Sequence, residues 1–197
     1  MPKVVDPIER RRELAQAVWR VVLRDGLDRA SVREVAREAG LSMGSLRHYF
    51  DSQSELLRFA MRMVIDRIEE RVAALHVPDE PREAVRTVLA ELLPLDSGRR
   101  VENEVWLAFT ARALVDPELR VLRDEAYDRL RGACERWISL LLAPDTPRLE
   151  VDLETERLFA LLDGLAVHAA MRPQTPDRLL AVLDHHLAQV VGGTGRT

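Results

Sequence analysis

Apolar residues recur at intervals of three and four along nearly the whole chain, and no segment alternates with the period of two that a strand requires. Proline and glycine interrupt this pattern at the places where helices are expected to end. The sequence therefore predicts an all-α fold of about nine helices, which cover residues 7–25, 32–39, 43–49, 53–76, 81–92, 99–115, 117–143, 152–172 and 176–191.

The composition agrees with a folded, helical protein. Apolar residues make up 47% and charged residues 31% of the 197 residues, which argues against a disordered chain. The single cysteine, Cys134, excludes an internal disulfide framework and a metal site built from several thiolates. No stretch of 18 residues lacks charge, and no apolar run follows Lys3, so we expect a cytoplasmic protein without a membrane span or signal peptide.

Charge is distributed unevenly along the chain. Residues 1–50 contain 10 Lys and Arg against 7 Asp and Glu, whereas the whole chain has a net charge of −4. A basic N-terminal segment followed by an acidic body is typical of a module that binds a polyanion and is joined to a second domain.

Two short predicted helices meet through a tight turn over residues 39–42. Ser31 and Glu34 have the spacing of a capping box at the start of the first helix, and Ser42 is a favourable N-cap for the second. Gly40 supplies the left-handed conformation that ends a helix at low cost. Together with the longer helix ahead of them, the two short helices have the layout of a helix-turn-helix, whose second short helix enters the DNA major groove.

The second short helix has an inward and an outward face. Leu46 and Phe50 form the inward, apolar pair. Gly44 lies on the outward face, where the absence of a side chain would let the helix approach the floor of the groove. The other outward residues are small or able to bind bases and phosphates: Met43, Ser45, Arg47 and His48.

The segment over residues 31–57, SVREVAREAGLSMGSLRHYFDSQSELL, resembles the DNA-binding domain of TetR-family transcriptional regulators. The likeness rests on the serine cap, the Ala-Gly turn, the Ser-x-Gly start of the second helix and its His-Tyr-Phe exit. The helix number and length are also similar to those of the family, and residues 106–109 and 116–119 resemble its BetI-like branch. The resemblance implies a homodimeric regulator, usually a repressor, that a small molecule releases from its operator.

This resemblance divides the chain into a DNA-binding domain over residues 1–52, with the helix-turn-helix at about 31–50, and an effector-binding and dimerisation domain over residues 53–197. The dimer should bind double-stranded, palindromic operator DNA. Members of the family often have Tyr where this chain has Arg47, which can also read guanine, and Lys where it has Gln53. The candidate DNA contacts are Ser31, Arg33, Ser42, Met43, Gly44, Ser45, Arg47, His48, Tyr49 and Gln53.

The acidic body is expected to bind the effector. Apolar and aromatic side chains on its helices, with few polar groups among them, favour a small apolar or amphipathic ligand. Arg112 and His168 are included because a charged or titratable group near an apolar face needs a partner. The candidate ligand contacts are Met61, Ile65, Trp106, Phe109, Arg112, Trp137, His168 and Met171.

The last two predicted helices are apolar on more than one side. A single chain buries one stripe of such a helix, so we expect a second copy to cover the rest and to form a four-helix interface. The candidate interface residues are Leu161, Leu165, Leu179, Leu183 and Leu187.

No arrangement of residues indicates an enzyme, a cofactor or a metal site. The adjacent His185 and His186 point about 100° apart on a helix, so they do not form the i, i+4 pair that binds zinc. No phosphate-binding loop and no nucleophile elbow is present. The alternative to a DNA-binding regulator is an all-α dimer that binds a small molecule or a protein and uses its N-terminal helices only for packing.

Overall fold

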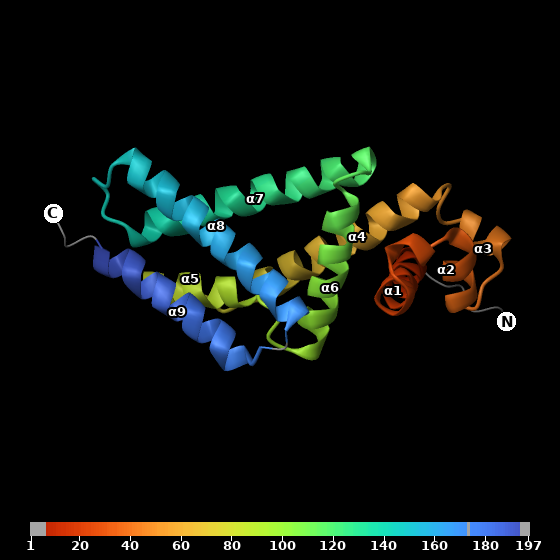
Figure 1. The fold of residues 1–197 in the computed structure, drawn as a ribbon, viewed down its shortest axis with the longest axis horizontal. Helices are drawn as coiled ribbons and strands as arrows, with labels where there is room; N and C mark the ends of the chain where they lie inside the picture. The colour runs from red at the N-terminus through yellow and green to blue at the C-terminus, as the bar shows by residue number, and fades with distance from the viewer. Residues whose placement is uncertain (1–6, 173, 194–197) are drawn as a thin grey trace. The chain divides into compact units, whose positions relative to one another are not determined.

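A computed structural model describes residues 7–172 and 174–193 of the chain, and within these ranges the secondary structure is entirely helical (Figure 1). The predicted all-α class is therefore confirmed. The elements are α1 (Pro7–Asp25), a 3-10 turn η1 (Leu27–Arg29), α2 (Val32–Glu38), α3 (Met43–Arg47), α4 (Gln53–Ala73), α5 (Pro81–Ala90), α6 (Ser97–Arg112), α7 (Pro117–Leu141), α8 (Arg148–Met171) and α9 (Pro176–Gly193).

Most helix boundaries lie within a few residues of the predicted ones. The largest difference at a helix start is in α8, which begins at Arg148 instead of residue 152. Pro147 occupies the N-cap position, and the Arg148 guanidinium binds Glu135 of α7 at 2.6 Å and Asp152 at 2.9 Å. These two ion pairs stabilise the first turn of α8. The spacing of apolar residues did not predict this turn, because the contacts that hold it are between charged side chains.

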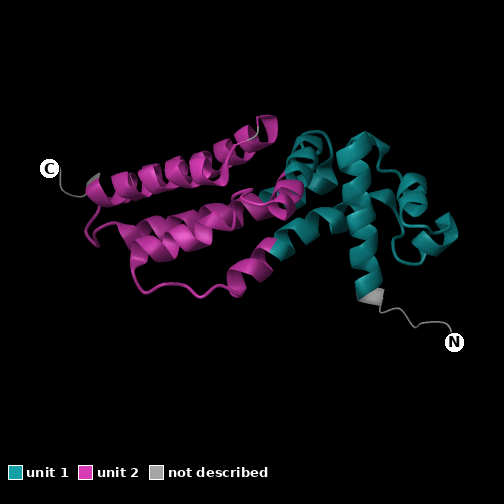
Figure 2. Ribbon diagram, turned by 90° about the horizontal axis from the view of Figure 1, so that it is seen from below, with its two compact units in different colours: residues 1–67, 104–124 teal, residues 68–103, 125–197 magenta. Residues whose placement is uncertain are grey.

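The chain divides into two compact units (Figure 2). Unit 1 contains residues 1–67 and 104–124, and unit 2 contains residues 68–103 and 125–197. This division differs from the expected boundary between residues 52 and 53. The first turns of α4 belong to unit 1 because they pack on α1, where the indole Nε1 of Trp19 donates a hydrogen bond to the carbonyl oxygen of Ala60 at 2.9 Å.

Unit 1 is built around the apolar stripe of α1. Leu14 and Val18 are fully buried there, and the Trp19 indole is covered on one face by the Arg67 guanidinium, 4.6 Å from the ring centroid. The inward residues of the two short helices, Val35 and Leu46, complete this core. The helix-turn-helix is therefore part of a larger unit that includes residues 53–67 of α4 and residues 104–124.

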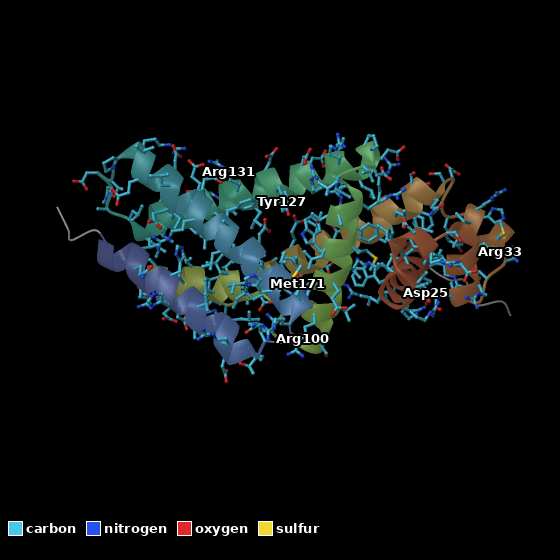
Figure 3. All side chains as sticks on the ribbon, in the orientation of Figure 1. Asp25, Arg33, Arg100, Tyr127, Arg131 and Met171 are labelled. Carbon is cyan, nitrogen blue, oxygen red and sulfur yellow. The ribbon has the colours of Figure 1, made fainter. Side chains whose placement is uncertain are left out.

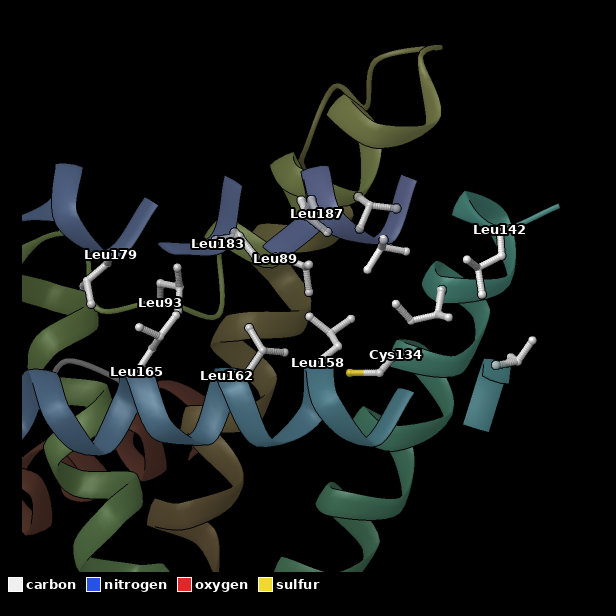
Figure 4. Packing of buried hydrophobic residues seen from close by; sticks show 14 residues of the cluster. Leu89, Leu93, Cys134, Leu142, Leu158, Leu162, Leu165, Leu179, Leu183 and Leu187 are labelled. Atoms are coloured by element: carbon white, nitrogen blue, oxygen red, sulfur yellow. The ribbon is translucent and has the colours of Figure 1, made fainter. Parts of the chain in front are cut away.

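Unit 2 has a leucine-rich core between α8 and α9, closed by residues from α5 and α7 (Figure 4). Leu165, Leu179, Leu183 and Leu187 are at most 8% exposed within this core, and Leu161 is partly buried against it. The assignment of the four buried leucines to the dimer interface is therefore corrected, because side chains that their own chain covers present no surface to a second copy. Leu161 is only partly covered, so its place in the interface stays a prediction. The periodicity identified these faces as apolar but did not show which partner covers them.

Candidate nucleic-acid interface

The two short helices and the turn between them adopt the expected local geometry. Gly40 has φ of 67°, and the backbone N–H of Leu41 donates back to the carbonyl oxygen of Ala36 at 2.8 Å, which closes the end of α2. Ser42 then caps α3, because its Oγ accepts a hydrogen bond from the backbone N–H of Ser45 at 3.0 Å. The turn is thus specified by one glycine and one serine.

The exposed face of α3 carries the residues that the sequence placed outward. Met43 is 44% exposed, and Gly44, Arg47 and His48 are exposed as well, whereas Leu46 is buried. Within the part of the chain that the structure describes, the side chains of Arg47 and His48 form no hydrogen bond or ion pair. Their donors are available to a ligand outside the protein.

Arg33, which Figure 3 labels on α2, is exposed in the same way, and no hydrogen bond or ion pair joins it to a described residue. Its neighbours on the same element are already paired, since the Glu34 carboxylate binds Arg37. Arg33 is therefore the cation on α2 whose charge no described residue compensates.

Several of the smaller candidates already have structural partners. The Ser42 and Ser45 hydroxyls lie 2.9 Å apart, and the Ser31 Oγ accepts from the backbone N–H of Glu34 at 3.3 Å. The side-chain amide of Gln53 donates to the carbonyl oxygen of Ala30 at 3.2 Å. Ser31 and Ser45 are only partly exposed, as is Tyr49, the remaining candidate.

The capping box at α2 forms only in part. Ser31 accepts the hydrogen bond that the sequence predicted, but Glu34 does not return one to the Ser31 N–H. The Ser31 N–H instead donates to the carbonyl oxygen of Arg29 at 2.7 Å. This acceptor belongs to the 3-10 turn η1, which the sequence did not predict.

Gly44 has room for a larger residue within the protein. A Cβ atom built on Gly44 would lie 3.8 Å from the Ser42 Oγ, which is an ordinary van der Waals contact. The packing of the chain therefore does not require glycine at this position, and close approach of α3 to DNA stays the predicted reason for it.

From the sequence, the arginine run over residues 10–12 is a candidate for phosphate contacts or else a solvated helix face, and the structure gives Arg11 a different role. Its guanidinium carbon lies 4.7 Å from the ring centroid of Phe50 and 5.0 Å from that of Phe59, and its Nη2 binds the Glu55 carboxylate at 2.7 Å. The position was detectable, because Arg11 precedes the buried Leu14 by three residues and so lies on the inward stripe of α1.

The candidate effector residues are distributed over both units. In unit 1, Met61 and Phe109 are fully buried, and Ile65 and Trp106 are partly buried. Arg112 is exposed and forms an ion pair with Asp28 at 3.2 Å. Arg112 therefore does not fit the apolar pocket that the sequence predicted.

In unit 2, Trp137 is partly buried against the leucine core. His168 is exposed, and Met171 is 75% exposed. Exposed side chains do not form buried apolar walls, so the assignment of His168 and Met171 to such a pocket is also corrected.

Unit 2 contains a cluster that the sequence did not reveal. Tyr127 of α7, labelled in Figure 3, packs edge-on against Phe159 of α8 with ring centroids 5.5 Å apart. The Tyr127 hydroxyl donates to the carboxylate of Asp163, one turn after Phe159. Burial nevertheless raises the pKa of Asp163 above its usual range, and among the described residues no cation pairs with it.

The described residues were also compared with what a metal site, a reactive thiol and a membrane-spanning helix require. No group of three or more His, Cys, Asp or Glu side chains in those ranges is arranged to hold a metal ion. Burial raises the pKa of the Cys134 thiol to about 12, so it remains protonated and unreactive near neutral pH. A search of the described helices finds none with both the length and the apolar character needed to cross a membrane.

Two sequence families match the chain. Residues 15–59 match the family described as bacterial regulatory proteins, tetR family, and residues 81–192 match the C-terminal domain of BetI-type transcriptional repressors. The first match includes the helix-turn-helix, and the second covers more than half of the chain.

Relatives match over nearly the full length. The HTH-type transcriptional regulator PksA of Bacillus subtilis (strain 168) is 40% identical over 195 residues, which is 96% of this chain and 94% of PksA. The HTH-type transcriptional regulator BetI 1 of Chromohalobacter salexigens is 30% identical over 184 residues, which is 90% of this chain and 87% of that protein.

Solved structures have the same fold. A transcriptional regulator from Rhodococcus sp. Rha1 superimposes with a TM-score of 0.83 at 31% identity, over 95% of this chain and 98% of that one. A putative regulator from Saccharomonospora viridis, determined in complex with choline, superimposes with a TM-score of 0.75 at 24% identity, over 92% of this chain and 96% of its own.

Proposed function

The chain belongs to the TetR family of transcriptional regulators and is a DNA-binding regulator, and from this premise we propose that it is a repressor that a small molecule releases from its operator. Repression and release by a ligand are typical of the family. The observation that carries the proposal is the exposed face of α3, where Gly44, Arg47 and His48 lie without a partner in the described chain.

TetR-family regulators act as dimers, so a palindromic operator fits the proposal. The two recognition helices would enter major grooves about one helical turn apart or slightly more, roughly 34 Å. If each subunit neutralises about three or four phosphates, log K falls with log salt at a slope of about −6. Fluorescence anisotropy of a labelled duplex from the DNA next to the gene, titrated at several salt concentrations, tests this directly. A salt-independent affinity, or protection of a single half-site, would contradict it.

We place the dimer interface on the outer faces of α8 and α9, now that the inner faces are known to be buried. Leu149 and Leu153 of α8 are 70% and 62% exposed, and they lie on one face of the helix. On α9, the exposed Ala181, His185 and Ala188 follow the i, i+4, i+7 spacing and lie on one face of the helix. Covering large exposed apolar residues is the driving force expected for a stable dimer.

For the effector we propose a small amphipathic organic cation, bound beside Tyr127, Phe159 and Asp163. A half-buried carboxylate without a counter-cation is costly unless a ligand supplies the positive charge. Aromatic rings attract cations through their quadrupole, and quaternary ammonium groups are bound in this way. Choline, which the Saccharomonospora viridis regulator binds, belongs to the same chemical class.

Two titrations test the effector and its coupling to DNA. Choline and tetramethylammonium would be titrated in a thermal-shift assay, against the wild type and the Asp163→Asn variant. We expect stabilisation that Asp163→Asn abolishes and that Asp145→Asn, a change at an exposed loop residue, leaves intact. Effector and operator should weaken each other by the same factor, typically about 5- to 150-fold. Equal ligand affinity with and without operator would show that the ligand is not the inducer.

A further inference from the structure

Arg11 of α1 connects to the chain that follows the recognition helix through two different contacts. Its guanidinium carbon lies 4.7 Å from the ring centroid of Phe50 and 5.0 Å from that of Phe59, and the two ring centroids are 5.4 Å apart. Its Nη2 donates to the Oε1 of Glu55 at 2.7 Å. The guanidinium is thus held by cation–π contacts with two rings and by a hydrogen bond to one carboxylate.

Two of the three partners of Arg11, Phe50 and Glu55, are hydrogen-bonded to the segment that leaves α3. The backbone N–H of Phe50 donates to the carbonyl oxygen of Leu46 within α3, at 3.1 Å. The second carboxylate oxygen of Glu55 accepts from the backbone N–H of Asp51 at 2.8 Å, in the turn between α3 and α4. One arginine is therefore linked to this turn through a ring and through a carboxylate.

The recognition helix needs such support because it is short. α3 has only 5 residues, and a helix of that length is not stable through its own hydrogen bonds. Its direction is therefore set by tertiary contacts on the buried side and at its ends. Leu46 supplies the contact on the buried side, where it is fully covered. Phe50, at 2% exposed, supplies the contact at the C-terminal end.

We propose that Arg11 is a positioning residue for DNA recognition, which fixes the direction of α3 through Phe50 and Glu55 without contacting DNA itself. This inference goes beyond the DNA-binding function by assigning a role in specificity to a side chain outside the helix-turn-helix. Lysine does not replace arginine in this role, because only the planar guanidinium stacks on the rings while its edge binds the carboxylate. The charge of Arg11 is already compensated by Glu55, so it contributes little to the attraction of phosphates.

The test measures how well the protein distinguishes its operator from other DNA. Affinities of the wild type and of the Arg11→Met and Arg11→Lys variants would be measured for a duplex recovered by selection from a random-sequence pool, and for a random duplex of the same length. We expect both variants to reduce the ratio of specific to non-specific affinity by about tenfold or more, which corresponds to roughly 1.4 kcal/mol. The slope of log K against log salt on the selected duplex should remain that of the wild type, because no phosphate contact is lost.

A matched variant distinguishes the loss of the positioning contact from the loss of one positive charge. Arg10→Met removes an equal charge from the neighbouring residue, whose guanidinium pairs with Glu13 on the surface of the same helix. It should leave the ratio unchanged. Partial unfolding of a variant lowers the active fraction equally for both duplexes, so the ratio of specific to non-specific affinity still reports the positioning of α3.

If Arg11→Met is insoluble, Phe59→Leu can replace it, because it removes one of the two rings that contact Arg11, and the same decrease in the ratio is expected. An unchanged ratio, or a salt slope reduced by about 1 or more per dimer, would overturn the proposal.

Discussion

The guanidinium of Arg157 on α8 donates to the Nδ1 of His186 on α9, with an Nη2–Nδ1 distance of 3.0 Å. Because a guanidinium only donates, Nδ1 must accept, and the neutral ring carries its proton on Nε2. That Nε2 is buried and has no partner among the described residues. Burial, the charge of Arg157 and the charge of His185, in decreasing order of effect, together lower the pKa of His186 to about 4.

This pair predicts a loss of stability in acid. The unfolded chain binds a proton at His186 near its ordinary pKa of 6.5, whereas the folded chain resists protonation until about pH 4. The contribution of His186 is therefore fully present above pH 6.5 and decreases as the pH falls toward 4, by an amount on the order of 3 kcal/mol. Urea denaturation at a series of pH values measures it. His186→Asn retains an acceptor for Arg157 but does not titrate, so its stability should depend less on pH. Parallel curves for the two proteins would contradict the expectation.

Gly44→Ala should weaken operator binding without destabilising the fold. The added methyl group has room within the protein, and alanine is more favourable than glycine inside a helix by about 0.5–1 kcal/mol. We expect an unchanged or higher melting temperature together with weaker operator binding in an anisotropy titration. Gly164→Ala on α8, where a Cβ atom would meet nothing within 4 Å, is the matched control and should bind the operator normally. Normal operator binding by Gly44→Ala would remove close approach as the reason for glycine.

Arg47 and Arg33 should have different roles at the interface. If Arg47 reads a base, Arg47→Ala costs about 1–3 kcal/mol and relaxes the preference at one operator position. Arg33→Ala should weaken binding to all duplexes alike and should make the salt dependence less steep, because it removes a phosphate contact from each subunit. Affinities for a set of single-base operator variants distinguish the two patterns. A uniform loss in Arg47→Ala would assign Arg47 to phosphate instead.

Two leucines of unit 2 test the corrected dimer interface. Leu183 is fully buried in the core, so Leu183→Ala should destabilise the protein by about 2–5 kcal/mol in chemical denaturation. Leu153 is 62% exposed, so Leu153→Glu should leave the fold intact and shift the protein toward monomer in light scattering. A Leu153→Glu protein that remains fully dimeric would place the interface elsewhere.

Cys134 should be protected in the native protein. Raising the pKa from 9.0 to about 12 lowers the thiolate fraction at pH 8 roughly a thousandfold, and burial also blocks access. A disulfide reagent such as dithionitrobenzoate should therefore react slowly with the native protein and promptly in 8 M urea. Cys134→Ser provides the blank. Rapid reaction under native conditions would show that the α7–α8 packing opens readily.

The sequence alone determined the helices and the turn that shapes the DNA-binding face. Apolar spacing, the caps Ser31 and Ser42 and the left-handed Gly40 act within a few residues, so they can be read from a short stretch of chain. The same local rules placed Leu46 inward and Arg47 outward, as the structure has them. Local spacing was enough because a helix fixes the directions of its own side chains.

The tertiary structure decided which side chains meet. Arg11 and Arg47 are the same residue type, yet one lies against two aromatic rings and the other is exposed. Leu183 lies on an apolar face whose partner proved to be the same chain. Tyr127 and Asp163 belong to different helices and meet only after those helices pack. Contacts between distant segments depend on how whole helices pack, and the period of a single helix carries no information about its neighbour.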